Sequence, residues 1–124
     1  MTADPRQTLG ISGEDLACAE LRRRGYEILE RRYRTRFGEI DIIARDRGTV
    51  VFVEVKTRLT DDFGGAAAAV TAWKQRRIAA MAVDYLARRR LHECACRFDV
   101  VAVDVEEAGP RITVYANAFD APSR

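Results

Sequence analysis

Two β-rich runs joined by a short polar turn constrain the fold of this chain more than any other feature. Residues 39–44 and 50–55 are rich in Ile and Val, and Arg45-Asp46-Arg47-Gly48-Thr49 connects them. β-Branched residues favour strands, and Asp and Gly supply the backbone conformations that a tight turn needs. The pattern predicts an antiparallel β-hairpin near the middle of the chain.

The alternation of side chains along a strand predicts which residues of this hairpin share a face. On the second strand, Glu54 and Lys56 lie on one face, while Val51, Val53 and Val55 lie on the other and are expected in the core. On the first strand, one expected face carries Glu39, Asp41 and Ile43. The opposite face carries Ile40, Ile42 and Ala44.

The register of the hairpin decides which charged residues meet. A turn through residues 46–49 sets Asp41 across from Glu54 and Glu39 across from Lys56. A slip of one residue would lose this alignment, and the sequence leaves that alternative open.

A first helix is expected before the hairpin. Ser12 and Asp15 resemble a capping box, so the helix should begin near Gly13, and Gly25 is a natural stop. Apolar runs predict further strands at residues 26–33, 98–105 and 111–115.

A second helix is expected over residues 70–89, with Trp73, Met81 and Tyr85 on its core face because apolar residues recur at helical spacing. The resulting order αβββαββ predicts a single α/β domain with a mixed central sheet. We expect the domain to span residues 11–119, between a flexible tail at 1–10 and a C-terminal tail at 120–124.

Composition indicates an ordinary cytoplasmic protein. The chain is 48% hydrophobic and 32% charged, and no apolar run approaches the roughly 20 residues of a membrane helix. Residues 1–10 contain no apolar segment of a secretory signal. The odd set of cysteines is expected to be reduced, and the His92–Cys96 stretch lacks the remaining ligands of a tetrahedral zinc site.

Basic residues are distributed unevenly. Of the 21 Lys and Arg residues, only Lys56 and Lys74 are lysine. A lysine ammonium is a compact charge that can lie beside a water or a phosphate oxygen. The arginines form clusters at residues 22–24, 31–36, 76–77 and 88–90, which are either a solvated surface or contacts to phosphate.

Two carboxylates that face each other across antiparallel strands repel. Protonation of one of them, an arginine bridge or a divalent cation would relieve the repulsion between Asp41 and Glu54. Hard oxygen ligands at this spacing suit Mg²⁺ or Mn²⁺. The alternative is a solvated salt bridge between one acid and Lys56 or an arginine.

The motifs resemble those of the YraN-type family of endonuclease-like proteins. The central match is Gly38-Glu39-Ile40-Asp41 followed by Phe52-Val53-Glu54-Val55-Lys56-Thr57-Arg58. This family belongs to the PD-(D/E)XK superfamily, which includes Holliday-junction resolvases and type II restriction enzymes, so the resemblance implies a restriction-endonuclease-like three-layer core. Further matches are Gly13-Glu14, Gly25-Tyr26, Tyr33-Arg34, Phe63-Gly64, Val70-Thr71, Lys74-Gln75-Arg76-Arg77 and Arg97-Phe98-Asp99-Val100.

The resemblance also implies roles for individual residues. Asp41 and Glu54 would hold the metal, and Lys56 would position or activate the attacking water. Glu14 would lean toward the metal, although an acid near the start of a helix is also favourable to the helix dipole. Asp99 is expected to be structural and to tie Arg97 or a neighbouring backbone group. Candidates for nucleic-acid contact are Arg34, Arg36, Arg58, Lys74, Gln75 and Arg77. Lys74 and Gln75 lie where related nucleases carry helix residues that face the cleft, although a solvated first helical turn is an equal alternative for them.

The chain departs from the family pattern at two places. Arg32 stands where an asparagine is usual, and Ala66 and Ala68 stand where Pro and Glu are usual. Loss of a carboxylate in that loop would weaken a second metal or a substrate contact.

These features lead to two functional hypotheses. The first is a metal-dependent nuclease that hydrolyses phosphodiester bonds in branched or single-stranded DNA, with a homodimer expected by analogy with resolvases. The second is a non-catalytic nucleic-acid-binding module that keeps the nuclease fold.

Overall fold

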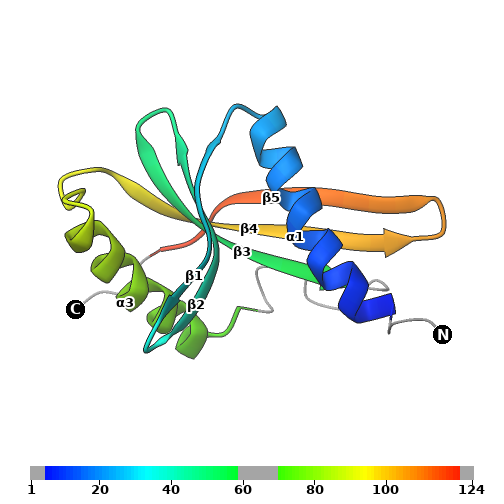
Figure 1. Cartoon of the computed structure of the whole chain (residues 1–124), viewed down its shortest axis with the longest axis horizontal. Helices are drawn as coiled ribbons and strands as arrows, with labels where there is room; N and C mark the ends of the chain where they lie inside the picture. Colours follow the sequence, from blue (N-terminus) through cyan, green and yellow to red (C-terminus); the bar gives the residue numbers. More distant parts are fainter. Residues whose placement is uncertain (1–4, 59–69, 121–124) are drawn as a thin grey trace.

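The computed structural model of the chain describes residues 5–58 and 70–120, which form a five-stranded sheet and two helices (Figure 1). The sheet order is β1-β2-β3-β4-β5, and only β3 and β4 run parallel. The expected α/β class with a mixed sheet is therefore confirmed. The elements are α1 (Pro5–Arg23), β1 (Glu27–Thr35), β2 (Gly38–Asp46), β3 (Thr49–Arg58), α3 (Ala72–Arg88), β4 (Cys96–Glu106) and β5 (Gly109–Phe119).

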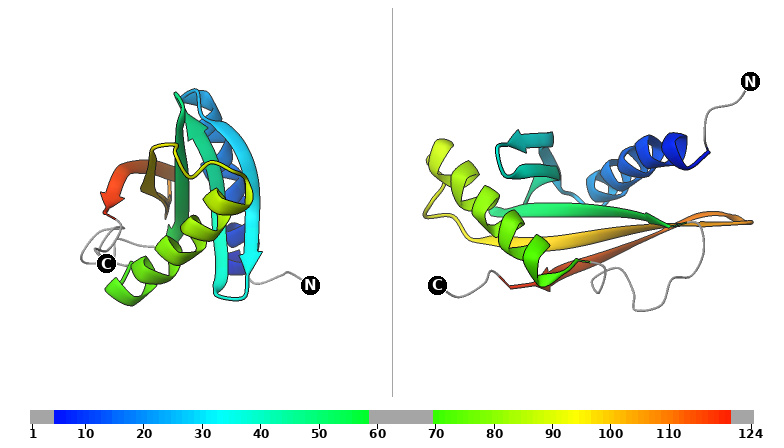
Figure 2. Two further views of the ribbon diagram at one scale, coloured as in Figure 1. Left: turned by 90° about the vertical axis from the view of Figure 1, so that its left-hand side faces the viewer. Right: turned by 90° about the horizontal axis from the view of Figure 1, so that it is seen from below.

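The two helices cover opposite faces of the sheet (Figure 2). On β3, Val51 and Val53 pack in the cluster under α1, whereas Phe52 between them packs in the cluster under α3. Parallel strands need a crossover connection, and α3 lies in the connection from β3 to β4. Both faces of β3 are therefore buried, and β3 is central to the core.

The predicted hairpin is confirmed as β2 and β3. Arg45 pairs with Val50 and Asp46 with Thr49. The two turn residues, Arg47 and Gly48, have φ values of 51° and 86°. Positive φ at both positions is what a type I′ two-residue turn requires, and such a turn fixes the register of the strands.

Helix α1 begins at Pro5, earlier than the capping-box pattern predicts, and overlaps the segment expected as a tail. Proline suits the first turn of a helix, because its missing N–H would have no partner there. Ser12 therefore lies inside the helix and is not its N-cap. The predicted end is correct: Gly25 has a φ of 93°, and the Tyr26 N–H donates to the Leu21 carbonyl at 2.9 Å.

The predicted core face of α3 is correct for Met81 and Tyr85, which are 2% and 3% exposed, and wrong for Trp73, which is 60% exposed. The helical turn explains the difference. At roughly 100° per residue, Trp73 lies about 140° around the helix from the buried Ile78. In the described ranges, no helix combines the length and apolar character of a membrane span.

The buried Asp99 has the expected structural role. It is fully buried on β4 and accepts hydrogen bonds from Arg97 Nε at 3.1 Å and from the Asn117 N–H at 2.9 Å. The Tyr26 hydroxyl donates to its second oxygen at 3.1 Å. These contacts join β4, β5 and the segment after α1.

Candidate metal and nucleic-acid site

The β2–β3 ladder ends where the candidate site begins. The last recorded pair is Ile42 with Val53, and one residue further Asp41 Oδ2 accepts the Val55 backbone N–H at 2.7 Å. The side chain of Asp41 thus replaces a backbone acceptor and holds the carboxylate against β3. This is the register that was expected to bring Asp41 and Glu54 together.

The same region corrects two expectations about side-chain placement. Ile40 packs in the α3 cluster, whereas strict alternation placed it with Ile42, which packs under α1. Arg32 on β1 has a φ of 53°. Its two neighbours pair with β2, Arg31 with Ile42 and Tyr33 with Ile40, but Arg32 does not pair with Asp41. The β1–β2 ladder is thus irregular at this level, and Ile40, which adjoins the break, lies on the other face of the sheet.

The second correction concerns Glu39 and Lys56, which were expected to face each other. Glu39 instead accepts a hydrogen bond from Arg34 Nε at 2.9 Å, across the β1–β2 pair. Lys56 pairs along the backbone with Ala102 of β4. Within the described residues, no ion pair of Lys56 is recorded, so its ammonium is available on the face that it shares with Glu54.

Asp41 carries the clearest electrostatic signature of the site. Burial, followed by the charge of Glu54, raises the pKa of Asp41 from 3.8 to about 7, and Glu14 adds to this rise. The Val55 N–H and the Lys74 charge act in the opposite direction. Three acids and one lysine are therefore close enough to influence one another.

Lys74 of α3 contacts Glu54 directly. Its Nζ lies 2.5 Å from Glu54 Oε1, and Glu54 is 8% exposed. Thr71 caps α3 by accepting the Lys74 N–H at 3.2 Å, which fixes the first turn that carries this lysine. The sequence placed Lys74 near the cleft only by resemblance, and a solvated first turn was an equal interpretation.

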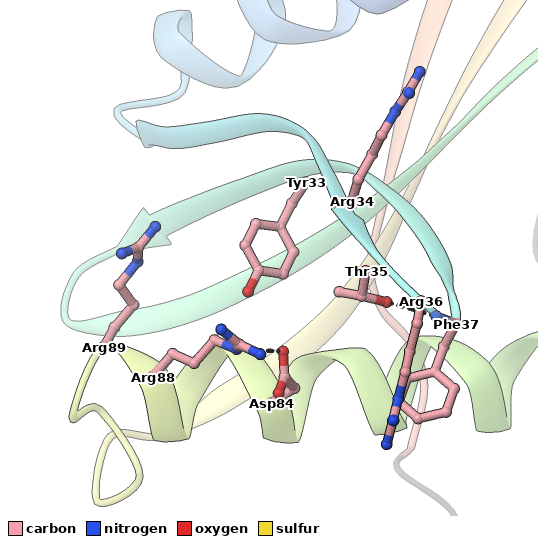
Figure 3. A pocket seen from close by; sticks show the side chains of 8 residues that line it. All are labelled: Tyr33, Arg34, Thr35, Arg36, Phe37, Asp84, Arg88 and Arg89. Atoms are coloured by element: carbon pink, nitrogen blue, oxygen red, sulfur yellow. Dashed lines mark hydrogen bonds and ion pairs between the residues drawn. The ribbon is translucent and has the colours of Figure 1, made fainter.

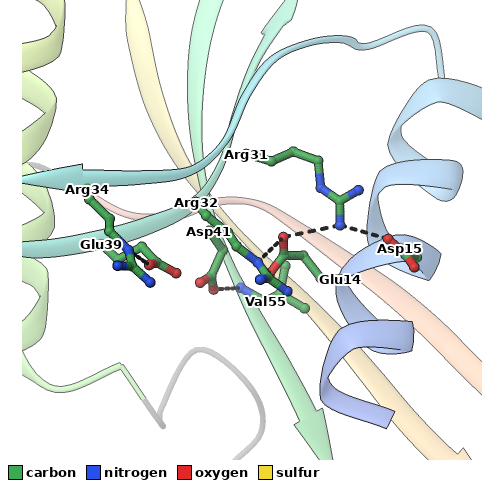
Figure 4. Close-up of polar contacts among 8 residues, drawn as sticks. All are labelled: Glu14, Asp15, Arg31, Arg32, Arg34, Glu39, Asp41 and Val55. Carbon is green, nitrogen blue, oxygen red and sulfur yellow. Dashed lines mark hydrogen bonds and ion pairs between the residues drawn. The ribbon is translucent and has the colours of Figure 1, made fainter. Parts of the chain in front are cut away.

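Glu14 of α1 approaches the same region from the other side (Figure 4). Arg31 Nη2 and Arg32 Nε lie 3.1 and 3.2 Å from Glu14 Oε1. The helix comes this close to β3 because Gly13 has no side chain: a Cβ there would collide with the Thr57 hydroxyl. The pairing of Glu14 with two arginines was not predicted, because no spacing rule relates a side chain in a helix to side chains in the strand that follows it.

The donor set fits a divalent cation held by two carboxylates. In the part of the chain that the structure describes, no three Asp, Glu, His or Cys side chains are grouped closely enough to form a metal site alone. Mg²⁺ needs only one or two carboxylates when water and phosphate complete its shell. Burial, and then the repulsion from Glu54, raise the pKa of Asp41, and a bound cation would offset both effects.

The other expected nucleic-acid contacts differ in availability. Arg34 and Arg36 are exposed, and Arg77 donates to the Phe37 carbonyl. Arg58 pairs with the buried Asp104, with Nε 2.7 Å from Oδ1, and its side chain is only 10% exposed. Gln75 donates to the Val70 carbonyl at 3.0 Å. Arg58 and Gln75 thus have partners within the fold, and Ala66 and Ala68 lie outside the described residues.

A pocket of about 630 Å³ lies between the β1–β2 turn and the second half of α3 (Figure 3). Asp41, Glu54 and Lys56 do not line it. Asp84 is the only acid in its lining, where it pairs with Arg88 at 3.0 Å. The arginines that line it are Arg34, Arg36, Arg88 and Arg89.

The family model and the relatives that match this chain all belong to one family. A family model described as "Uncharacterised protein family UPF0102" matches residues 13–103, which include all four residues expected to act in catalysis. A UPF0102 protein of Geobacter metallireducens is 46% identical over 114 residues, which are 92% of this chain and 93% of the relative.

A UPF0102 protein of Syntrophus aciditrophicus is 50% identical over 111 residues, covering 90% of this chain and 87% of the relative. One from Geobacter sulfurreducens is 48% identical over 113 residues, covering 90% and 88%. The names of these relatives state no activity. The resemblance seen in the motifs is confirmed, and the chain belongs to the UPF0102 family, the YraN-type family of endonuclease-like proteins.

Proposed function

We propose that this protein is a Mg²⁺- or Mn²⁺-dependent nuclease with a restriction-endonuclease-like core that hydrolyses phosphodiester bonds in DNA. One observation carries the proposal. The carboxylate of Asp41 on β2 is held against β3 close to Glu54, and burial together with the charge of Glu54 raises its pKa to about 7. Two neighbouring buried carboxylates lower the stability of a protein that has no metal ion bound to them. Carboxyl groups with strongly shifted pKa values are more frequent at functional sites than elsewhere.

The residues of the site divide the chemistry between them. Asp41 and Glu54 would hold the ion, which when bound supplies positive charge to the phosphate and makes a water more acidic. Lys56, on the face of Glu54, would orient the attacking water and stabilise the negative charge that develops on it as its proton passes to the surrounding solvent. Lys74 neutralises Glu54 in the free protein, and its ammonium would be available to a phosphate oxygen if Glu54 held a metal ion.

Substrate selection would depend on the shape of the nucleic acid more than on its sequence. Arg34, Arg36 and Arg77 lie around the β1–β2 turn and the first half of α3. Arginine contacts to phosphate position a substrate but do not distinguish bases. We therefore propose branched or single-stranded DNA as the substrate, a homodimer as the form that acts on two-fold junctions, and the cytoplasm as the compartment.

The test is cleavage of four-way junction, flap and single-stranded DNA in the presence of Mg²⁺ or Mn²⁺. Asp41→Ala and Lys56→Ala are expected to slow cleavage by at least about 100-fold, a usual contribution of a group that assists proton transfer. Glu107→Gln, which removes an exposed acid from the β4–β5 turn, is the matched control and should cleave normally. Cleavage that survives both Asp41→Ala and Lys56→Ala would exclude this site.

A second function, a non-catalytic nucleic-acid-binding module, is favoured by the ion pairs of the site. Glu54 is bound by Lys74, and Glu14 by Arg31 and Arg32, so cations of the protein itself already satisfy two of the acids. Such a module would bind DNA equally well with and without a chelator and would give no cleavage product.

A further inference from the structure

Two large aromatic side chains are exposed where the β1–β2 turn approaches the start of α3. Phe37, in the turn, is 43% exposed, and Trp73, in the first turn of α3, is 60% exposed. A single exposed apolar residue is common on a protein surface, but neighbouring exposed aromatic rings usually mark a binding surface.

Arg77 joins the two aromatic residues. Its guanidinium carbon lies 4.6 Å from the centre of the Trp73 ring, and its Nε donates to the Phe37 carbonyl at 2.7 Å. Gly38 permits this contact, because a Cβ at that position would collide with the Arg77 guanidinium and its φ of 133° suits glycine. The guanidinium of Arg36 in turn lies 4.9 Å from the centre of the Phe37 ring.

Several positive charges around these rings have no carboxylate partner among the described residues. Across residues 5–58 and 70–120, no carboxylate partner is recorded for Arg36, Arg76 or Arg77. Some exposed arginines elsewhere are paired, such as Arg23 with Glu20 and Arg88 with Asp84, whereas others, such as Arg47 and Arg90, also have no ion pair recorded in the described ranges. The exposed aromatic surface thus carries several positive charges, of which the exposed Arg36 and Arg76 are placed to contact phosphate, while Arg77 is held between the two aromatic residues.

Each of the two aromatic residues, Phe37 and Trp73, lies next to a part of the chain that contributes to the candidate metal site. Trp73 directly precedes Lys74, whose Nζ contacts Glu54, and Phe37 and Gly38 lead into the strand that carries Asp41. Figure 3 shows Arg36 and Phe37 side by side at the turn above α3, where they also form one wall of the arginine-lined pocket.

We propose that Phe37 and Trp73 form a stacking platform that binds the unpaired bases of single-stranded nucleic acid next to the Asp41–Glu54 site. Every base presents a π-face, so stacking on aromatic residues tolerates any sequence, while arginines around the rings follow the backbone. Bases inside a duplex already stack on one another and cannot use the platform. This inference rests on the proposed function, because it names the substrate class of the same site.

Trp73 is the single tryptophan of the chain, so its fluorescence reports directly on the platform. The experiment titrates the full chain, in EDTA and at low salt, with three probes of equal length: oligothymidylate, the corresponding duplex, and an abasic oligonucleotide. We expect oligothymidylate to quench Trp73 emission and to bind about tenfold more tightly than the abasic probe. The duplex should bind more weakly and without quenching.

Variants test the two rings separately, with binding followed by the anisotropy of a labelled oligothymidylate. Phe37→Ala and Trp73→Leu are each expected to weaken binding about tenfold, and Trp73→Phe should retain most of the affinity because it keeps a ring. Tyr115→Ala removes a comparably exposed aromatic residue from β5, at the opposite edge of the sheet, and should bind like the wild type.

The inference is overturned if the abasic probe binds as tightly as oligothymidylate, or if Trp73→Leu behaves like Tyr115→Ala. Trp73 emission that changes with protein concentration but not with oligonucleotide would assign the surface to contact between copies of the chain and would also overturn it. Because no metal is present, the result is independent of cleavage. Quenching by oligothymidylate without any Mg²⁺-dependent cleavage would support the platform and refute the proposed nuclease.

Discussion

Replacement of Asp41 by asparagine is expected to stabilise the protein above neutral pH and to leave its stability unchanged in acid. Burial and the neighbouring Glu54 raise the pKa of Asp41 from 3.8 to about 7. Between these two pH values the folded protein retains a proton that the unfolded chain has released. The free energy of unfolding of the wild type therefore falls as the pH rises through this window.

The size of the effect follows from the difference between the two pKa values. At about 1.4 kcal/mol per pH unit, the gap between wild type and Asp41→Asn opens near pH 4 and reaches about 4 kcal/mol above pH 7. The asparagine keeps the shape of the side chain, and its carbonyl oxygen can still accept the Val55 N–H. The charge of Glu54 is then left without a repelling neighbour.

Urea denaturation of both proteins at several pH values between 4 and 8 measures this gap. Glu107→Gln, the control at the exposed β4–β5 turn, should differ from the wild type by less than about 0.5 kcal/mol at every pH. Mg²⁺ added at pH 8 should stabilise the wild type and not Asp41→Asn, because ligands stabilise the state that binds them. A gap that stays constant with pH, or a variant less stable than the wild type at pH 8, would refute the reasoning.

Three further variants test other contacts. Gly13→Ala should lower the free energy of unfolding by about 1–3 kcal/mol through collision with the Thr57 hydroxyl, and Thr57→Ala in the same chain should recover most of the loss; no recovery would contradict the collision. Asp99→Ala should cost about 3 kcal/mol in denaturation, since it removes a buried carboxylate with three partners. Lys74→Met should tighten Mn²⁺ binding about threefold in calorimetry by removing the cation that competes for Glu54; weaker binding would contradict that competition.

The centre of the candidate site was predictable because it depends on local geometry. Side chains alternate along a strand, so Glu54 and Lys56 had to share a face that Val53 does not. The two-residue turn at Arg47 and Gly48, which the nearby Asp and Gly had indicated, then set the register that brings Asp41 beside β3. Each of these steps involves residues that are close together in the chain.

The partners of the acids were not predictable in the same way. Lys74 binds Glu54, and Arg31 and Arg32 bind Glu14, between different elements whose side chains meet only through tertiary packing. Many arginines of this chain could have served equally well, and the sequence contains no spacing rule that selects among them.

Sequence periodicity and turn chemistry together therefore predicted the hairpin, the α/β class and which strand residues share a face, since backbone geometry repeats every two residues in a strand and about every 3.6 in a helix. Only the tertiary structure decided that Trp73 is exposed, that the ladder breaks at Asp41, and that Lys74 closes over Glu54. Those outcomes depend on how α3 packs on the sheet and how β1 pairs with β2. At these contacts, residues distant in the chain determine the free energy of burying or pairing a side chain.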